Sequence, residues 1–124
     1  MISSSSLNIG KALNELLKDI APTFPLLAEQ SAQYPFIVYR RMSLDVANTK
    51  DVFNYAEFAT CEVIVAHQKY SESISLAQQI KDKLEHFRGK IDDVHIFSIY
   101  LSSASEDFVN DAYIQKLIFR IEII

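Results

Sequence analysis

The three histidines are the side chains in this chain best suited to binding a metal ion. His67, His86 and His95 could in principle join Asp92 and Asp93 around a metal ion, since imidazole with carboxylate is a common ligand set for zinc. We expect one histidine at a strand end, one on the polar side of a helix and one at a strand start, so nothing brings them together. Two adjacent aspartates are also typical of a turn. We therefore predict solvated side chains here and no metal site.

Cys61 is the only cysteine, which excludes an intrachain disulfide. It stands in the middle of an expected strand, on the face that we expect to be buried. A cysteine in that place is usually a small buried hydrophobe, because a nucleophilic thiolate needs a polar, partly exposed setting. We predict no catalytic role for it.

Three acidic residues, Glu106, Asp107 and Asp111, stand in a polar segment that could attract a cation. They lack the ligand spacing and the glycine of a calcium loop, so we predict a solvated loop. The basic pair Arg40 and Arg41 is expected in a strand, where neighbouring side chains point to opposite faces. One arginine pairs with a carboxylate across a strand or subunit boundary, or both reach solvent.

No sequence motif of an enzyme is present. Glycine occurs only at Gly10 and Gly89, and neither belongs to a phosphate-binding loop. A nucleophile elbow and the His-Glu-x-x-His spacing of metalloproteases are also absent from the sequence. We predict that the protein is not an enzyme and binds no cofactor.

Composition indicates an ordinary globular domain spanning residues 1–124, with a flexible polar leader over 1–6. Of the 124 residues, 49% are hydrophobic and 23% charged, which is enough to build a core. The net charge of −4 gives no basic footprint for sequence-specific binding of nucleic acid. No apolar run approaches the ~20 residues that span a membrane, and the start lacks a secretory pattern. We therefore expect a cytoplasmic protein.

Two helices are predicted, over Leu7–Ile20 and Tyr70–Gly89. In the second helix, Ser71 is expected to cap the first amides and Gly89 to end it in a left-handed conformation. Apolar residues recur in both helices at three- and four-residue steps, so each helix has one apolar face. In the first helix these residues are Ile9, Leu13, Leu16, Leu17 and Ile20, and in the second they are Ile74, Ala77, Ile80, Leu84 and Phe87.

The remaining chain reads as strands joined by polar connections. We predict loops over Ser43–Asn54 and Ser103–Asp111 and a charged turn over Lys90–Asp93. The expected strands are a short edge strand at Phe24–Leu27, followed by Tyr34–Met42, Tyr55–His67, Val94–Ser102 and Tyr113–Ile124.

These elements predict an α+β fold in the order α-β-β-β-α-β-β. Four to five mostly antiparallel strands form one sheet, and both helices cover the face that carries Val63, Val65, Phe97, Ile99, Leu117 and Phe119. The opposite face is unusually apolar for one that meets water. We expect there Tyr39, Ile64, Ala66, Tyr100, Ile114 and Ile118, mixed with Glu62, Lys116 and Arg120. Either the sheet curls on itself or another subunit covers this face, and we favour a subunit contact.

Several segments together resemble a known family. They are Ile9–Leu13 in the first helix, the strand Tyr34–Arg41, the helix Ser71–Phe87 and the strand Tyr113–Ile121. In order and spacing they are similar to the small tail-completion, or tail-terminator, proteins of long-tailed bacteriophages and prophages. One departure concerns the glycine-rich loops of that family, which this chain lacks, so its loops are not carried over.

The resemblance implies a structural protein that forms a ring, commonly of six subunits, at the head-proximal end of the tail. Its partners would be copies of itself, the tail tube and head–tail connector proteins, and its final place the virion tail. On this basis we expect subunit contacts at Tyr39, Arg41, Ile64, Tyr100 and Ile118. A second group of residues is expected to face the lumen of the ring or a docking partner. It consists of Asp45, Asp51, Glu106, Asp107 and Asp111.

A different class of function is also open. The chain could be a small dimeric α+β domain that binds a ligand, or an adaptor unrelated to phage. A ligand-binding domain needs a pocket with converging polar groups, for which the sequence offers no candidate.

Overall fold

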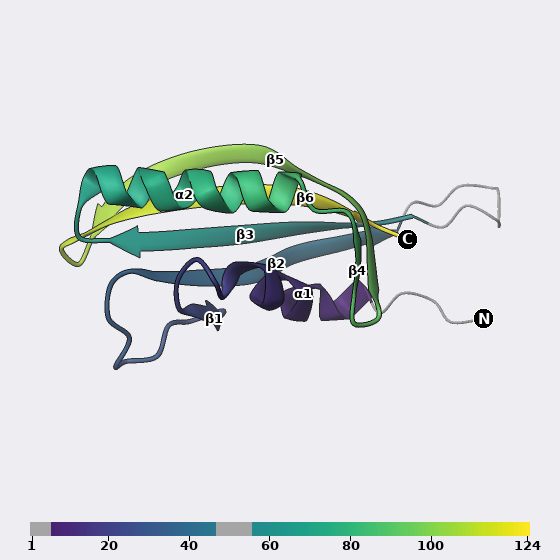
Figure 1. The fold of residues 1–124 in the computed structure, drawn as a ribbon, viewed down its shortest axis with the longest axis horizontal. Coiled ribbons are helices and arrows are strands. Elements are labelled where there is room, and N and C mark those ends of the chain that lie inside the picture. The colour runs from purple at the N-terminus through teal and green to yellow at the C-terminus, as the bar shows by residue number, and fades with distance from the viewer. Residues whose placement is uncertain (1–5, 47–55) are drawn as a thin grey trace.

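The computed structural model describes residues 6–46 and 56–124, which form one sheet and two α-helices (Figure 1). The described part begins with a 3-10 helix at Ser6–Asn8. The helices are α1 at Ile9–Leu17 and α2 at Tyr70–Glu85. The strands are β1 Thr23–Pro25, β2 Phe36–Val46, β3 Glu57–His67, β4 Gly89–Ile91, β5 Val94–Val109 and β6 Ala112–Ile123.

The six strands lie in the order β1-β2-β3-β6-β5-β4. Neighbouring strands are antiparallel except β1 and β2, which are parallel. The α+β class is confirmed, whereas the predicted count of four to five strands is wrong. The additional strand is β4, which we predicted as part of a charged turn. It forms a hairpin with β5 through Asp92 and Asp93, and Asp92 adopts a left-handed φ of 52°.

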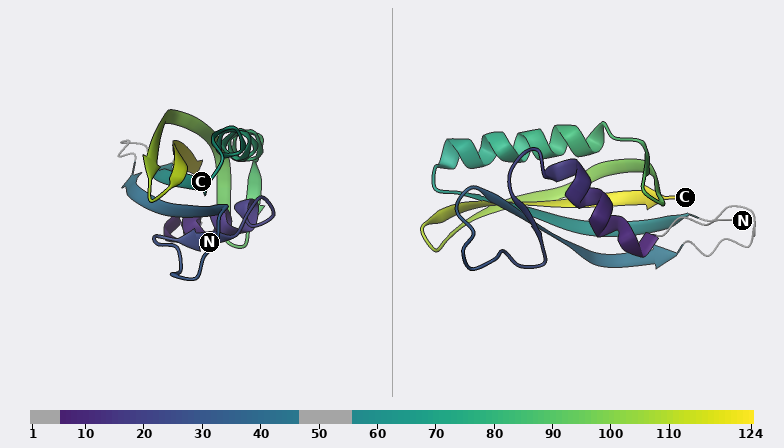
Figure 2. Two further views of the ribbon diagram at one scale, coloured as in Figure 1. Left: turned by 90° about the vertical axis from the view of Figure 1, so that its left-hand side faces the viewer. Right: turned by 60° about the horizontal axis from the view of Figure 1, so that its bottom comes forward.

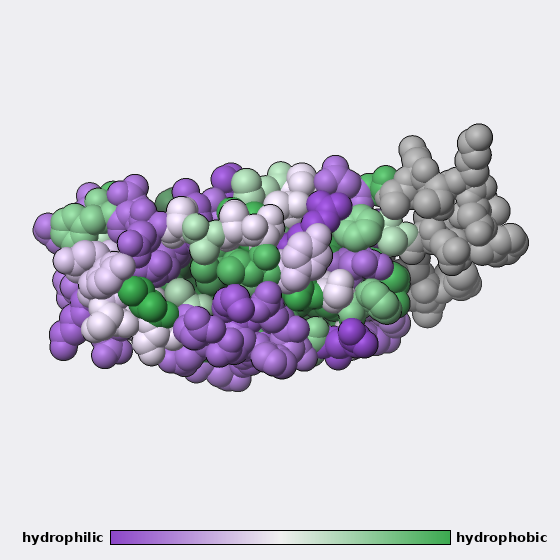
Figure 3. All heavy atoms as spheres, turned by 90° about the horizontal axis from the view of Figure 1, so that it is seen from above, coloured by the Kyte–Doolittle hydropathy of each residue, from purple (hydrophilic) through white to green (hydrophobic). Residues whose placement is uncertain are grey.

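Both helices cover the same face of the sheet, as predicted (Figures 1 and 2). Seen from the side of α2, a band of hydrophobic residues is bordered by hydrophilic ones (Figure 3). Within the described residues, no helix is long and apolar enough to cross a membrane. The core residues that α1, α2, β3 and β6 bury include Ile9, Leu13, Leu17, Ile80, Leu84, Val63, Val65, Phe119 and Ile121.

Tyr39 belongs to this core, so its predicted place on the opposite face is wrong. It lies opposite Val63 on β3 and is 8% exposed. Gly10 of α1 explains how the ring fits, because a Cβ at Gly10 would stand 3.1 Å from Tyr39 Cε2. The small residue lets the helix approach the ring closely.

The ends and buried face of α2 differ from our prediction. Ser71 does not cap the helix, because Lys69 occupies the N-cap position. Ser73 takes the buried place that we expected for Ile74, which is 42% exposed. Ser73 tolerates burial because its hydroxyl donates to the carbonyl of Tyr70 at 2.6 Å. The helix ends at Glu85, and Gly89 (φ 139°) begins β4 instead of ending α2.

Strand β5 contains two register shifts, and the first explains an error in its predicted face. The pairing with β6 shifts between Ile96 and Ser98, and again between Leu101 and Ser103. An extra residue in a strand breaks the alternation of its faces. Phe97 is consequently 46% exposed, although we predicted it in the core, and its ring lies 5.4 Å from the guanidinium carbon of Arg88.

Two predicted loops are partly strand. Ser43–Val46 continues β2, and Ser103–Val109 continues β5 to a two-residue turn at Asn110 and Asp111. Both turn residues adopt left-handed φ angles, 52° and 61°, as in the tight hairpin turns that asparagine and aspartate favour. The rest of the first predicted loop, including Asp51, lies outside the described residues.

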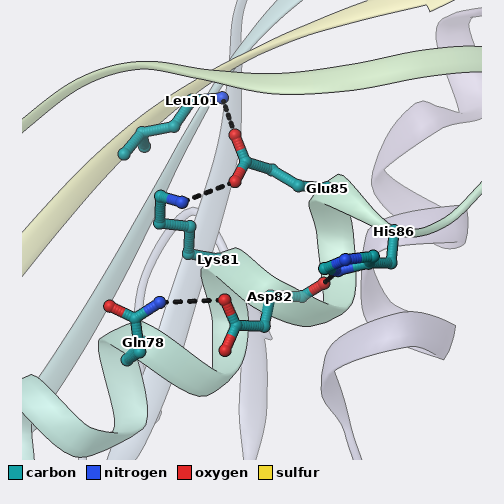
Figure 4. Close-up of polar contacts among 6 residues, drawn as sticks. All are labelled: Gln78, Lys81, Asp82, Glu85, His86 and Leu101. Carbon is teal, nitrogen blue, oxygen red and sulfur yellow. Dashed lines mark hydrogen bonds and ion pairs between the residues drawn. The ribbon is translucent and has the colours of Figure 1, made fainter.

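Glu85 joins the end of α2 to the second register shift of β5 (Figure 4). One carboxylate oxygen accepts a hydrogen bond from Lys81 Nζ at 2.7 Å, and the other accepts one from the backbone N–H of Leu101 at 3.0 Å. The bond from Lys81, followed by that from Leu101, lowers the pKa of Glu85. Nearby on the same helix, Gln78 donates to Asp82 at 2.8 Å.

We expect Glu85→Ala to lower the free energy of unfolding by about 1 kcal/mol, because Leu101 loses a charged acceptor. A lowered carboxyl pKa contributes stability above the unfolded value and loses it as the pH falls through the folded value. The difference between variant and wild type should therefore be full above about pH 5 and fade in acid. Urea unfolding across pH measures it, with Gln79→Ala on the exposed side of α2 as the control. An equal difference at all pH values would contradict the assignment.

Candidate subunit interface

The side of the sheet opposite the helices is covered by no helix or further strand within the described part of the chain. At its hairpin end, the Tyr34 ring stacks on Phe36 at 5.2 Å and its hydroxyl donates to the carbonyl of Asn110 at 3.4 Å. Alternation along the strands places there every second residue of β2, β3 and β6 and part of β5. We call this surface the uncovered face. It comprises Phe36, Val38, Arg40, Phe58, Glu62, Ile64, Tyr100, Ile114, Lys116, Ile118 and Arg120.

An ion cluster occupies the middle of the uncovered face. Glu62 on β3 accepts a hydrogen bond from Arg40 Nε on β2 at 3.0 Å, and its other oxygen lies 3.8 Å from Lys116 Nζ on β6. The side chain of Glu62 is 9% exposed, whereas those of Arg40 and Lys116 are about half exposed at 48% and 45%. A buried carboxylate needs such partners, because desolvation disfavours the charge. The ion pairs of the cluster link strands β2, β3 and β6, and the two cationic side chains remain at the surface.

Apolar and aromatic groups surround the cluster. Ile64 and Ile118 are half-buried beside Glu62. Towards the far end of the strands, the guanidinium carbon of Arg120 stands 4.5 Å from the centre of the Phe58 ring, a cation–π contact. Tyr100, opposite Arg120 on β5, is 47% exposed. Aromatic side chains and arginine are the residues that protein interfaces favour.

The structure brings together only part of the predicted contact set. Ile64, Tyr100 and Ile118 lie on the uncovered face. Tyr39 is buried against α1 on the other side. Arg41 also points to the helix side, where its Nη1 donates to the carbonyl of Leu7 at 2.9 Å. The expectation that Arg40 and Arg41 point to opposite faces is confirmed, and Arg40 is the one that pairs with a carboxylate.

The predicted docking acids are spread over the molecule. Asp45 lies on β2 opposite Phe58, Glu106 and Asp107 lie on β5, and Asp111 lies in the hairpin turn. Their predicted placement in loops is thus wrong for three of them, since β2 and β5 extend through those positions. The fifth, Asp51, is outside the described residues.

Glu106 is held by α2 and β6. Its carboxylate accepts hydrogen bonds from the Tyr70 hydroxyl at 3.1 and 3.0 Å and from Gln115 Nε2 at 3.0 Å. The bond to Glu106 raises the pKa of Tyr70. Gln115, which also donates to Ser73 Oγ at 3.2 Å, was missed by our reasoning from the sequence. Its signal was a polar side chain at a core-facing position of an otherwise apolar strand.

Two of the side chains considered for chemistry take part in the packing or the hydrogen bonds of the fold. Cys61 is buried as predicted, and burial raises its thiol pKa to about 12, so it is protonated at neutral pH. His67 Nδ1 accepts a hydrogen bond from the backbone N–H of Lys69 at 2.9 Å. Across residues 6–46 and 56–124, no three His, Cys, Asp or Glu side chains are placed to hold a metal ion.

Comparison with known proteins identifies a fold and no family. No protein-family model matches the chain, and no curated protein matches it in sequence. Among solved structures, a chain described as "Virion of native gene transfer agent (GTA) particle" is similar with a TM-score of 0.66 and 14% sequence identity. The similarity covers 90% of this chain and 83% of that one. At this identity the likeness shows that the two chains share a fold.

We expect Glu62 and Arg40 to stabilise the fold jointly. A double-mutant cycle with Glu62→Ala and Arg40→Ala should give a coupling free energy of about 1 kcal/mol, because their hydrogen bond is charged and one partner is buried. Urea unfolding of the four proteins measures it. The control cycle combines Arg40→Ala with Glu85→Ala. These residues share no partner, so their effects on the free energy of unfolding should add. If the effects also add in the cycle of Glu62 and Arg40, the interaction between these two residues contributes nothing to stability.

Proposed function

We propose that this protein is a structural component of a phage or prophage particle, acting as a tail-completion protein. In this proposal it forms a ring at the head-proximal end of the tail and helps to join the tail to the capsid. Two observations support it. The fold is shared with a chain from a gene transfer agent virion. The segments Ile9–Leu13, Tyr34–Arg41, Ser71–Phe87 and Tyr113–Ile121 resemble tail-completion proteins along nearly the whole chain.

The uncovered face is the observation that carries the proposal. A sheet face that only meets water is usually polar, whereas this one combines half-buried Ile64 and Ile118 with exposed Tyr100. Arg40 and Lys116 already pair with Glu62, which lowers the cost of covering them and leaves the cluster with a net positive charge. In the particle, another subunit covers this face.

The remaining roles follow from that placement. The protein folds in the cytoplasm of the host and passes into the virion tail, where its partners are copies of itself, the tail tube and connector proteins. A ring requires contacts in which one patch meets a different patch of the neighbour. No cofactor or nucleic acid takes part in this role.

We expect a lysine in the uncovered face to prevent the joining of heads and tails. Cells whose prophage lacks this gene should produce separate heads and tails, and wild-type protein supplied in trans should restore headed particles, counted by electron microscopy. Ile118→Lys should not restore them, because a covered interface would then bury a third cation beside the single carboxylate of Glu62. The control is Ile74→Lys, which places the same charge on exposed α2.

Two results would overturn the proposal. One is the appearance of headed particles without the gene, which would remove the joining role. The other is full restoration by Ile118→Lys, which would show that nothing covers the uncovered face. Circular dichroism of both purified variants establishes that they are folded.

A further inference from the structure

Two sheet edges are open within the described residues, and they belong to different strands. β1 pairs with β2 only at Ile37–Tyr39, so the outer edge of β2 has no strand partner from Arg40 to Val46. β4 pairs with β5 only at Val94–Ile96, and Glu85 of α2 accepts the N–H of Leu101, so the outer edge of β5 is open beyond Leu101 towards Val109. An open edge presents unpaired backbone groups that another strand can bind.

The strand directions allow these two edges to pair between copies of the chain. The four long strands β2, β3, β6 and β5 alternate in direction, so β5 runs opposite to β2. If one copy follows another around an axis, β2 of the second lies beside β5 of the first, and these two strands are antiparallel. Each added copy thus continues the same alternation. This contact joins two different patches, as a ring requires.

One pairing register matches charge on both faces of the sheet. Opposite residues in an antiparallel pair share a face. Arg41 and Glu106 both lie on the helix side, and Arg40 and Asp107 both lie on the uncovered side. Placing Arg41 opposite Glu106 therefore places Arg40 opposite Asp107 as well. Both arginines already have an intrachain partner, but each guanidinium has further N–H donors.

The backbone groups fit the same register. Ile37 N–H and Tyr39 C=O bond towards the β1 side, so by alternation the backbone of Arg41 faces the open edge of β2. On β5, Val109 and Ala112 flank the two-residue turn and form a hydrogen-bonded pair. Val109 and every second residue before it therefore turn their backbone groups towards β6, and the residues between them, including Glu106, turn theirs outward. Arg41 and Glu106 can then exchange two backbone hydrogen bonds.

Exposed apolar residues lie at the end of this contact. Beyond Arg40, the edge of β2 is occupied by β1 and by Leu26, whose N–H bonds to Tyr39 C=O. Leu26 and Leu27 are 72% and 80% exposed, and at the hairpin end of β5 Phe108 is 55% exposed. The strand pairing therefore ends with Arg40 opposite Asp107, and the hairpin beyond it meets these leucines of the next copy.

We infer that copies of this chain associate edge to edge, with β5 of one copy added antiparallel to β2 of the next. Arg41 faces Glu106 and Arg40 faces Asp107 across the contact. The inference rests on the proposed ring and deepens it, because it names the strands that join the subunits. The open edge of β5 lies near the β5–β6 hairpin and that of β2 at the other end of the molecule, so successive copies are staggered along the strands (Figure 1).

Disulfide mapping tests the contact. In the register above, Arg40 of one copy is opposite Asp107 of the next, ahead of the register shift of β2 between Arg41 and Ser43. Oxidation of the double variant Arg40→Cys, Asp107→Cys should give a ladder of covalent dimers, trimers and larger species on a denaturing gel. Each single variant should give no ladder, and the control double variant Arg40→Cys, Gln79→Cys should give none either. A second variant, Asp107→Arg, faces Arg40 with a like charge and should raise the concentration at which the protein associates at least tenfold.

Rings seen by electron microscopy without a ladder, and with association unchanged in Asp107→Arg, would overturn the edge contact but leave the proposed function standing. A protein that stays monomeric up to millimolar concentration would also overturn it, since open complementary edges should associate there. Failure of the proposed function shows separately, as headed particles that form without the gene.

Discussion

The pairing of β3 with β6 is the contact on which the rest of the structure depends. It runs without a register shift from Glu57 opposite Ile123 to His67 opposite Tyr113, at the centre of the sheet. Because strand side chains alternate between faces, this pairing places Val63 and Phe119 under the helices and Glu62 and Ile118 on the other side. A slip of one residue would exchange the two faces, so the core and the uncovered face are set by the same hydrogen bonds.

The buried half of this arrangement was predictable from the sequence. The spacing of apolar residues along the sequence is enough to predict both helices, the strands β3 and β6 and the burial of Cys61. The solvent-exposed end of β5 was not predictable from the sequence. The segment Ser103–Val109 has no apolar face, so its sequence indicates a loop, but pairing with β6 makes it a strand. The exposure of Phe97 depends on a register shift, and the burial of Tyr39 on the close approach of Gly10. Both are properties of tertiary packing that a local pattern does not contain.

For the candidate contacts, the sequence supplied the residues but did not separate the surfaces. Ile64, Tyr100 and Ile118 lie together because their side chains point to the same face of the sheet. Arg41 and Glu106 lie at two open edges, which only the strand order reveals. The two surfaces suit different contacts. The edges suit a side-by-side contact between copies, and the uncovered face, with its apolar and aromatic groups, suits a covering subunit. The tail-completion role proposed above would use both surfaces.

If the proposed contacts form, the isolated chain can close on itself through unlike patches. Light scattering over a wide concentration range measures this as absolute mass, with negative-stain images of the largest species. We expect a mass that rises to one fixed multiple of the monomer and images of closed rings. A tight dimer that persists at every concentration would contradict it, because two copies joined symmetrically would leave no open edge for a third.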